Sequence, residues 1–315
     1  MKKPKILVMG DVNVDLVVPL SDRSIAGVEQ RDSALELHGG GTAANVAVAL
    51  ARLGEKVSFI GTVGDDGYGR WVKEDLLNES VDTKETRLVK EAFTSMVLAI
   101  IYPDGERGLY VWPDRGGAHT KLHPRDIKEE FIRSYSWLHT TGLCLREEPV
   151  RGAQLKAMEL AQAAGITVSL DLNLRLESWG MDQPLKKVFE EAIGYSQVIF
   201  GSGIEEIIPY TGESTVEAGA DLLSAGKRVV IARQGVKGAL VVKPDGIYES
   251  PAFEVDVVDT LGAGDAFNGG FIAARLSGKD LLEAARWGNA TAALKIGRTG
   301  ARGLPSRKAI FDLLN

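Results

Sequence analysis

The chain reads DTLGAGD over residues 259–265, and an apolar helical pattern follows directly. The first backbone amides of a helix lack intrahelical acceptors, and the helix dipole adds partial positive charge there. Glycines let an anion approach such amides closely, so Gly262, Ala263 and Gly264 form a candidate phosphate site. A carboxylate there would repel phosphate unless it had a second function. Asp265 is therefore a candidate general base that takes a proton from an attacking hydroxyl. A helix cap with a tight turn is the alternative.

A second glycine cluster, GGGTAAN, occupies residues 39–45 between a predicted strand and a predicted helix. Consecutive glycines lose much backbone entropy on folding, so we expect a small ligand to lie against Gly40 and Gly41. Asn45, one turn into the helix, would bond a ligand hydroxyl. The cluster also fits the dinucleotide pattern G-x-G-x-x-A, which needs an acidic residue about 20 positions on. The next strand ends at residues 60–62 as IGT, which weakens that interpretation.

A third polar group, Asn13 and Asp15, follows the first predicted strand in the segment DVNVD at residues 11–15. Alternate residues of an extended chain point the same way. An amide and a carboxylate side by side suit a polyol, and turn residues at the end of a strand are the alternative.

Short β-branched runs alternate with longer helical patterns along the chain. Predicted strands lie at 6–9, 57–60, 137–139, 168–171, 198–200 and 229–232, and predicted helices at 42–53, 149–164, 266–276, 281–295 and 306–314. Several strand runs are apolar at consecutive positions, as in strands covered on both faces. The alternation predicts an α/β fold with a mainly parallel sheet and right-handed crossovers.

Two pairs of predicted strands have no helix between them. They lie at 16–18 with 33–38 and at 94–102 with 109–112, and a third hairpin is predicted over 239–249. We expect the first two pairs to form a small antiparallel subdomain, from about 13–38 and 94–115, inserted into one domain spanning 1–315. Such a subdomain would be a lid over a cleft or a subunit interface; an ordinary edge hairpin is the alternative.

Composition excludes several classes of protein. The 315 residues include 36 glycines, against roughly 22 at average usage. The net charge of −6 disfavours nucleic acid as the main partner. The lone Cys144 suits a reducing compartment and is expected to be a small buried hydrophobe. The apolar run 96–102 is too short for a membrane span, and Asp11 ends the first apolar run too early for a signal peptide. We therefore expect a cytoplasmic protein.

His119 and His123 have zinc-ligand spacing, but Pro124 disfavours a zinc site there.

Together the clusters resemble the two signatures of the ribokinase-like (PfkB) carbohydrate kinase family. They stand here as GG-x-x-x-x-NVA from residue 39 and DT-x-GAGD from residue 259, and the resemblance covers nearly the whole chain. It implies a three-layer α/β fold with a central, mostly parallel sheet and a small β-sheet lid. It also implies an ATP-dependent sugar kinase, with Asp265 as catalytic base and the 262–265 backbone as anion hole.

The resemblance assigns further residues to two ligands. Asn13, Asp15, Gly40, Gly41 and Asn45 match positions that contact sugar hydroxyls. Thr260, Arg233, Gly235, Gly238 and Asn289 match the nucleotide side, with Asn289 near the adenine and Arg233 near the phosphates.

One motif departs from the family pattern. Relatives carry Asn-x-x-Glu, associated with magnesium and phosphate, where this chain has GIEE at residues 203–206. Glu206 remains as an indirect metal residue, and Gly203 replaces the asparagine. We expect Mg²⁺ with the ATP phosphates. The resemblance also raises a monovalent cation such as K⁺ near Asp259, Leu261 and Gly300, held largely by backbone carbonyls.

The acceptor sugar stays open: ribose, fructose or 2-keto-3-deoxygluconate are the candidates. The segment DLNLR at 171–175 resembles fructokinases and keto-deoxy acid kinases, and Arg175 would hold an acid carboxylate or form a structural salt bridge. The residues expected to close on the substrate from the lid are Arg107, Tyr110, Trp112 and Arg115.

A nucleoside kinase, with Tyr110 and Trp112 stacking on a base, is the alternative function. An NAD(P)-binding oxidoreductase and a non-catalytic sugar-binding regulator are more distant ones. A homodimer through the lid strands is expected.

Overall fold

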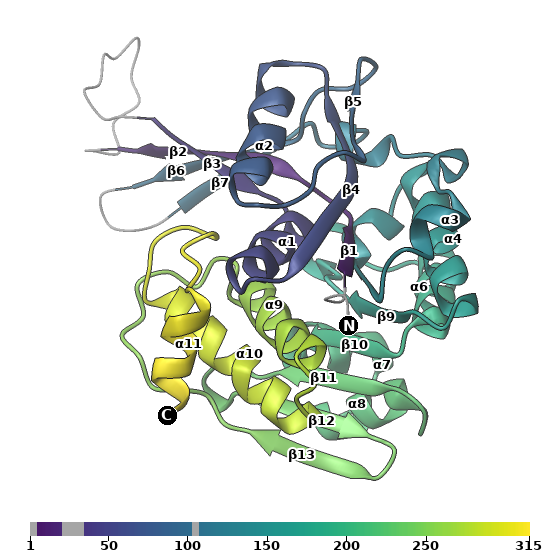
Figure 1. Cartoon of the computed structure of the whole chain (residues 1–315), viewed down its shortest axis with the longest axis vertical. Helices are drawn as coiled ribbons and strands as arrows, with labels where there is room; N and C mark the ends of the chain where they lie inside the picture. The colour runs from purple at the N-terminus through teal and green to yellow at the C-terminus, as the bar shows by residue number, and fades with distance from the viewer. Residues whose placement is uncertain (1–4, 21–34, 103–106) are drawn as a thin grey trace.

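The computed structural model describes residues 5–20, 35–102 and 107–315 (Figure 1). Its strands are β1 (Lys5–Met9), β2 (Asn13–Pro19), β3 (Glu36–Gly40), β4 (Lys56–Gly64), β5 (Thr86–Val89), β6 (Met96–Ile101), β7 (Arg107–Trp112), β8 (Trp137–Thr141), β9 (Thr167–Asp171), β10 (Val198–Ser202), β11 (Val229–Arg233), β12 (Ala239–Lys243) and β13 (Gly246–Ser250). Its α-helices are α1 (Thr42–Arg52), α2 (Gly67–Asn78), α3 (Glu129–Ile132), α4 (Val150–Ala163), α5 (Leu176–Trp179), α6 (Gln183–Tyr195), α7 (Ile208–Thr211), α8 (Val216–Ser224), α9 (Ala263–Leu276), α10 (Leu281–Ile296) and α11 (Arg307–Leu314).

A nine-stranded sheet forms the centre of the described chain, in the order β13-β12-β11-β10-β9-β8-β1-β4-β5. The strands from β11 to β5 pair in parallel, and the β12–β13 hairpin adds two antiparallel strands at one edge. Every strand predicted for this sheet is present. The α/β fold expected from the alternation of strands and helices is confirmed.

Consecutive apolar residues of β1 pack alternately into two separate hydrophobic cores. Ile6 and Val8 pack into a core with α1, α9 and α10, whereas Leu7 and Met9 pack into a core with α4, α6 and α8. All four side chains are 0–1% exposed. Helices therefore cover both faces of the sheet, and this produces the three-layer arrangement visible in Figure 1. Cys144 belongs to the second core, as a small buried hydrophobe.

The strands expected to form a lid make a separate four-stranded sheet in the order β3-β2-β6-β7, called the lid below, which projects from the body beside α2 (Figure 1). The expected antiparallel subdomain is wrong in one pairing, because β2 and β6 are parallel. Each is the inner strand of its own antiparallel pair, β2 with β3 and β6 with β7. Residues 33–34 of the predicted strand 33–38, and the predicted turn at 103–105, lie outside the described residues.

The sheet order reverses beside β1. The chain runs from β1 to β4 on one side and later continues through β8, β9, β10 and β11 on the other. Ligands of open α/β sheets bind outside the carboxyl ends of the strands at such a reversal. Asp11, Thr141, Asp171 and Arg233 all lie at these ends. In the part of the chain that is described, no helix is long and apolar enough to cross a membrane.

Helix α9 is enclosed between α1 and α10, and two glycines make that packing close. A Cβ on Gly269 would lie 2.5 Å from the Cβ of Ala49 in α1. A Cβ on Gly270 would lie 2.8 Å from both the Thr291 Cβ and the Trp287 carbonyl oxygen in α10. These glycines allow close helix packing, which places the start of α9 beside the start of α1.

We predict that Gly270→Ala destabilises the protein by about 1–3 kcal/mol, because the added methyl group overpacks the contact with α10. Gly194→Ala in α6 is the matched control, since nothing lies within 4 Å of a Cβ at that position. Alanine there should be neutral or stabilise by up to about 1 kcal/mol. Urea denaturation of both variants checks this. Equal midpoints for the two variants would contradict close packing as the role of Gly270.

Candidate active site

The segment around Asp265 forms an open helix N-terminus. Gly262 is the N-cap of α9 with φ +74°, a left-handed conformation that favours glycine. A Cβ there would also lie 2.9 Å from the Ala301 carbonyl oxygen. Within the described ranges, the amides of Gly264 and Asp265 have no hydrogen-bond acceptor. The backbone predicted from the glycine pattern is therefore open to an anion.

Asp265 meets the other glycine cluster through a side-chain contact. Asn45 Nδ2 donates to Asp265 Oδ2 at 2.9 Å, joining residues 220 positions apart. Asn45 is 5% and Asp265 9% exposed. Burial raises the pKa of Asp265 to about 8, and the charges of Asp171 and Asp11 add to that rise. The Asn45 hydrogen bond and the Arg233 charge act in the opposite direction. The site thus holds a carboxyl group poised to carry a proton near neutral pH.

Arg233 lies next to this turn, and other side chains of the protein bind its guanidinium group. Its two terminal nitrogens donate to the two carboxylate oxygens of Asp171, both at 2.9 Å, and Nη1 donates to Asn268 Oδ1 at 2.7 Å. A Cβ on Gly264 would lie 3.3 Å from its Cζ. Burial opposes the charge on Arg233, yet Asp171 raises its pKa above the ordinary value. The predicted phosphate contact of Arg233 stays a prediction, because the guanidinium already has a carboxylate partner in this structure.

Glu206 is bound by backbone amides. It accepts hydrogen bonds from Ser202 N at 2.6 Å and Leu174 N at 2.7 Å, and burial raises its pKa. The glycine that replaces the asparagine of the Asn-x-x-Glu motif has a steric reason, because a Cβ on Gly203 would lie 2.8 Å from a Val216 methyl carbon. Among the described residues, no group of three or more His, Cys, Asp and Glu side chains could hold a metal ion. Within the described residues, the chain therefore has no cluster of side chains that would bind Mg²⁺ by itself.

Asp11 is a site residue that the sequence analysis did not single out. It accepts from Thr42 N at 2.6 Å, Ala43 N at 3.2 Å and Thr141 Oγ1 at 3.1 Å. It therefore anchors the first turn of α1 to the ends of β1 and β8. The sequence feature that could have identified Asp11 is an acidic residue two positions after a buried strand and two positions before Asn13.

The glycines at 39–41 make room for the chain's own atoms. A Cβ on Gly40 would lie 2.6 Å from the Asp15 carboxylate oxygens and 2.7 Å from Asn13 Nδ2. Gly41 has φ +97°, and a Cβ there would lie 2.6 Å from the Val12 Cα. These contacts explain the glycines without a ligand. The ligand expected at Gly40 and Gly41 stays a prediction.

Arg302 is a second residue that the sequence analysis missed. Its Nε donates to Asn45 Oδ1 at 3.2 Å, and its Nη2 donates to the Gly40 carbonyl oxygen at 3.4 Å. It also pairs with Asp75 of α2. Burial lowers its pKa, while Asp75 acts in the opposite direction. Arg302 thus joins α2, the glycine cluster and Asn45 from a loop near the C-terminus.

Strand register determines which lid residues share the face of Asp15. Asp15 is paired with Val97, and Val97 with Val111. Tyr110 is aligned instead with Leu98 and Leu16, on the opposite face, together with Trp112 two residues further on. If Asp15 contacts the substrate, these two aromatic residues face away from it. Arg115 is exposed, and the side chain of Arg107 lies outside the described part.

The remaining predicted residues differ in their burial and local contacts. Asn289 is buried, and its Nδ2 donates to the carbonyl oxygens of Ser250 at 2.9 Å and Pro251 at 3.1 Å. Thr260 and Arg175 are exposed. Gly235 begins a short 3-10 turn between β11 and β12, and Gly238 follows the last residue of that turn. The ligand contacts expected of these residues stay predictions.

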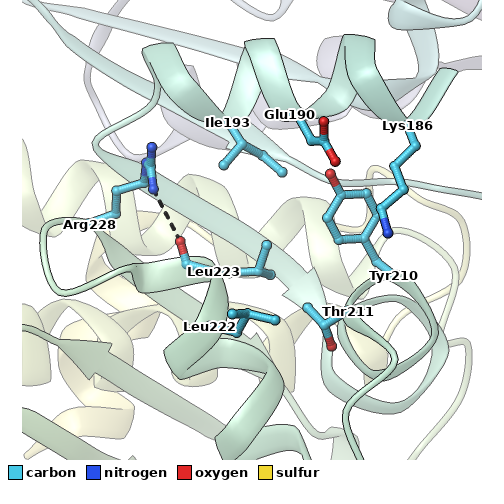
Figure 2. A pocket seen from close by; sticks show the side chains of 8 residues that line it. All are labelled: Lys186, Glu190, Ile193, Tyr210, Thr211, Leu222, Leu223 and Arg228. Carbon is cyan, nitrogen blue, oxygen red and sulfur yellow. Dashed lines mark hydrogen bonds between the residues drawn. The ribbon is translucent and has the colours of Figure 1, made fainter. Parts of the chain in front are cut away.

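A cavity of about 250 Å³ lies apart from these residues, between α6, α7 and α8 (Figure 2). Figure 2 shows its lining: Lys186, Glu190, Ile193, Tyr210, Thr211, Leu222, Leu223 and Arg228. None of these residues belongs to the site around Asp265.

Known proteins resemble the chain over nearly its full length. The model of the pfkB family carbohydrate kinases matches residues 3–308. The ATP-dependent ribose-1-phosphate kinase of Halopiger xanaduensis is 33% identical over 311 residues, covering 99% of this chain and 98% of that protein.

Two solved structures share the fold. Aminoimidazole riboside kinase from Salmonella enterica, complexed with aminoimidazole riboside and an ATP analog, has a TM-score of 0.83 at 29% identity, covering 99% of this chain and 100% of that one. A fructokinase double mutant from Vibrio cholerae O395, bound to fructose, ADP and potassium, has a TM-score of 0.84 at 30% identity, with 99% of each chain covered. With the Asn45–Asp265 site on the expected fold, the chain belongs to the pfkB family of carbohydrate kinases.

Proposed function

We propose that the protein transfers the γ-phosphoryl group of ATP to a hydroxyl of a small sugar or sugar derivative, with Asp265 as the general base. The observation that carries this proposal is a buried carboxyl group at a helix N-terminus whose Gly264 and Asp265 amides are open. Base and anion site then lie within one helical turn. This is the arrangement that positions an attacking hydroxyl against a phosphorus atom.

Each group of residues at the site has a separate role in the proposed reaction. Asn45 holds Oδ2 of Asp265, which leaves Oδ1 to accept the proton of the attacking hydroxyl. The open amides stabilise the negative charge on the transferred phosphoryl oxygens. Asn13 and Asp15, on the lid face that carries Val97 and Val111, bind other hydroxyls of the sugar. Mg²⁺ would arrive with ATP and neutralise phosphate charge.

The acceptor is proposed to be a small furanose, a sugar acid or a riboside. The relatives named above act on ribose 1-phosphate, aminoimidazole riboside and fructose, according to their names. A nucleoside kinase remains the second candidate because one of them takes a riboside. The lid register argues against base stacking on Tyr110 and Trp112. We also propose a cytoplasmic location, on the ground of the lone buried Cys144.

We predict ATP consumption with at least one member of a panel of sugars, sugar acids and nucleosides, and its loss in Asp265→Asn. The asparagine cannot take the proton, so turnover should fall by about 10²–10⁴-fold. Asp280→Asn is the matched control, because Asp280 also starts a helix and accepts from Glu283 N at 2.8 Å. It should keep wild-type turnover. Near-normal turnover in Asp265→Asn would refute the assignment of the base.

The raised pKa of Asp265 predicts a pH dependence. Because the base must be ionised, kcat/KM should rise with pH and level off above about 8. The same shift affects stability, since the folded protein binds this proton more tightly than the unfolded chain. That contribution is complete below 3.8, the ordinary pKa of an aspartate, and is lost as pH rises through about 8.

Asp265→Asn removes this loss, so its thermal midpoint should rise relative to that of the wild type between about pH 5 and pH 8, and the difference should level off above pH 8. Differential scanning calorimetry across that range measures the difference. A constant difference at every pH would show that Asp265 is ionised throughout.

We propose that a second copy of the chain covers the outer face of the lid. Tyr110 and Trp112 on the edge strand β7 are 57% and 67% exposed, on the face opposite Asp15. Exposed aromatic residues on an edge strand are typical of an interface between chains.

Trp112→Glu should therefore yield a monomer in analytical ultracentrifugation, while the wild type sediments as a dimer. Leu222→Glu, at a residue that is 56% exposed on α8, is the control and should leave the dimer intact. A monomeric wild type at micromolar concentration would contradict this interface.

A further inference from the structure

The last turn of α10 contains a lysine that is completely buried. Lys295 is 0% exposed. Lysine is almost never fully buried unless its charge is paired, because removing an ammonium group from water is costly. Its Nζ donates to the backbone carbonyl oxygen of Asp259 at 2.7 Å. The ammonium group thus lies at the first residue of the segment that leads into the anion site.

Asp259 connects three pieces of backbone at this point. Its Oδ1 accepts from Leu261 N at 3.0 Å, and its Oδ2 accepts from Gly300 N at 2.8 Å. Its own amide donates to the Ile296 carbonyl oxygen at 3.0 Å. The end of α10, the loop at Gly300 and the segment before Gly262 therefore converge on one residue, and the ammonium group of Lys295 lies within that convergence.

This is also the place where the family resemblance suggests a monovalent cation held by backbone carbonyls near Asp259, Leu261 and Gly300. The structure does not fit that expectation, because an amine of the chain already occupies the Asp259 carbonyl oxygen. A lysine ammonium is a compact single positive charge with three donors, so it offers oxygen atoms the same charge as a bound K⁺.

We propose that Lys295 supplies a tethered cation in place of a dissociable monovalent ion, and that the enzyme works without K⁺. The positive charge orients the Asp259 carbonyl and holds residues 259–262 in the conformation that opens the Gly264 and Asp265 amides. Lys295 is a positioning residue, since it contacts the loop and not the reacting atoms. The kinetic part of this inference rests on the proposed kinase function.

The first test compares the wild type in potassium, ammonium, sodium and choline chloride at constant ionic strength. We expect equal kcat, equal KM for ATP and equal thermal midpoints in all four salts. Stimulation of kcat by K⁺ together with a higher midpoint in K⁺ would overturn the proposal. The thermal midpoint needs no sugar acceptor. It therefore decides this question even if the proposed kinase reaction is not found.

The second test removes the tethered charge. Lys295→Ala should lower kcat by about tenfold or more in choline chloride, because a displaced loop misplaces the anion site. Ammonium, methylammonium or K⁺ should restore most of that loss and raise the thermal midpoint, since the vacated space accepts a free cation. A loss that no cation restores would show a purely structural role and overturn the proposal, as would wild-type kcat in choline.

Lys156→Ala is the matched control, because Lys156 Nζ also donates to a backbone carbonyl oxygen, that of Pro124, at 2.8 Å. Its kcat and midpoint should not respond to the choice of cation. If the Lys295→Ala protein does not fold, Lys295→Met keeps most of the side-chain volume and undergoes the same measurements. Failure of both variants to fold in any of the salts, ammonium included, would also overturn the proposal.

Discussion

The hydrogen bond between Asn45 and Asp265 depends on how closely two helices approach each other. The start of α1 must lie beside the start of α9, and the Ala49–Gly269 contact permits that approach. Asp11 fixes the first turn of α1 to the sheet, and Gly262 sets the direction in which α9 begins. The two glycine-rich segments are thus joined by packing as well as by polar contacts.

Burial of Asp265, together with the charges at the carboxyl ends of the strands, explains the raised pKa of its carboxyl group. Asp11 and Asp171 both disfavour ionisation of Asp265, and Arg233 only partly offsets them. Arg233 is engaged by Asp171, so its charge is not fully available to the neighbouring carboxyl group. Asp265 consequently holds its proton more tightly than an exposed aspartate would. An arriving hydroxyl and phosphate therefore meet a base whose affinity for a proton is already high.

Local sequence signals were sufficient for every strand of the central sheet except β5, for the helices α1, α4, α9, α10 and α11, and for the Asp265 turn. Doubly covered strands appear as apolar runs, and glycines before a helix indicate an open N-terminus. The parallel pairing of β2 with β6 was not predictable, because only the tertiary structure brings those strands together. Arg302 and Lys295 were missed for the same reason. Each is an ordinary basic residue locally, and its partners Asn45 and Asp259 lie far from it in the sequence.

The parallel contact between β2 and β6 also affects how the lid forms during synthesis. β2 leaves the ribosome long before β6, since β4, α2 and β5 are made between them. Until β6 emerges, β2 can pair only with β3, and an isolated two-stranded hairpin is marginally stable. The lid therefore cannot be exchanged between homologues as one continuous cassette. A chimaera must replace two separate segments together, and the β4–β5 unit between them must remain compatible with both.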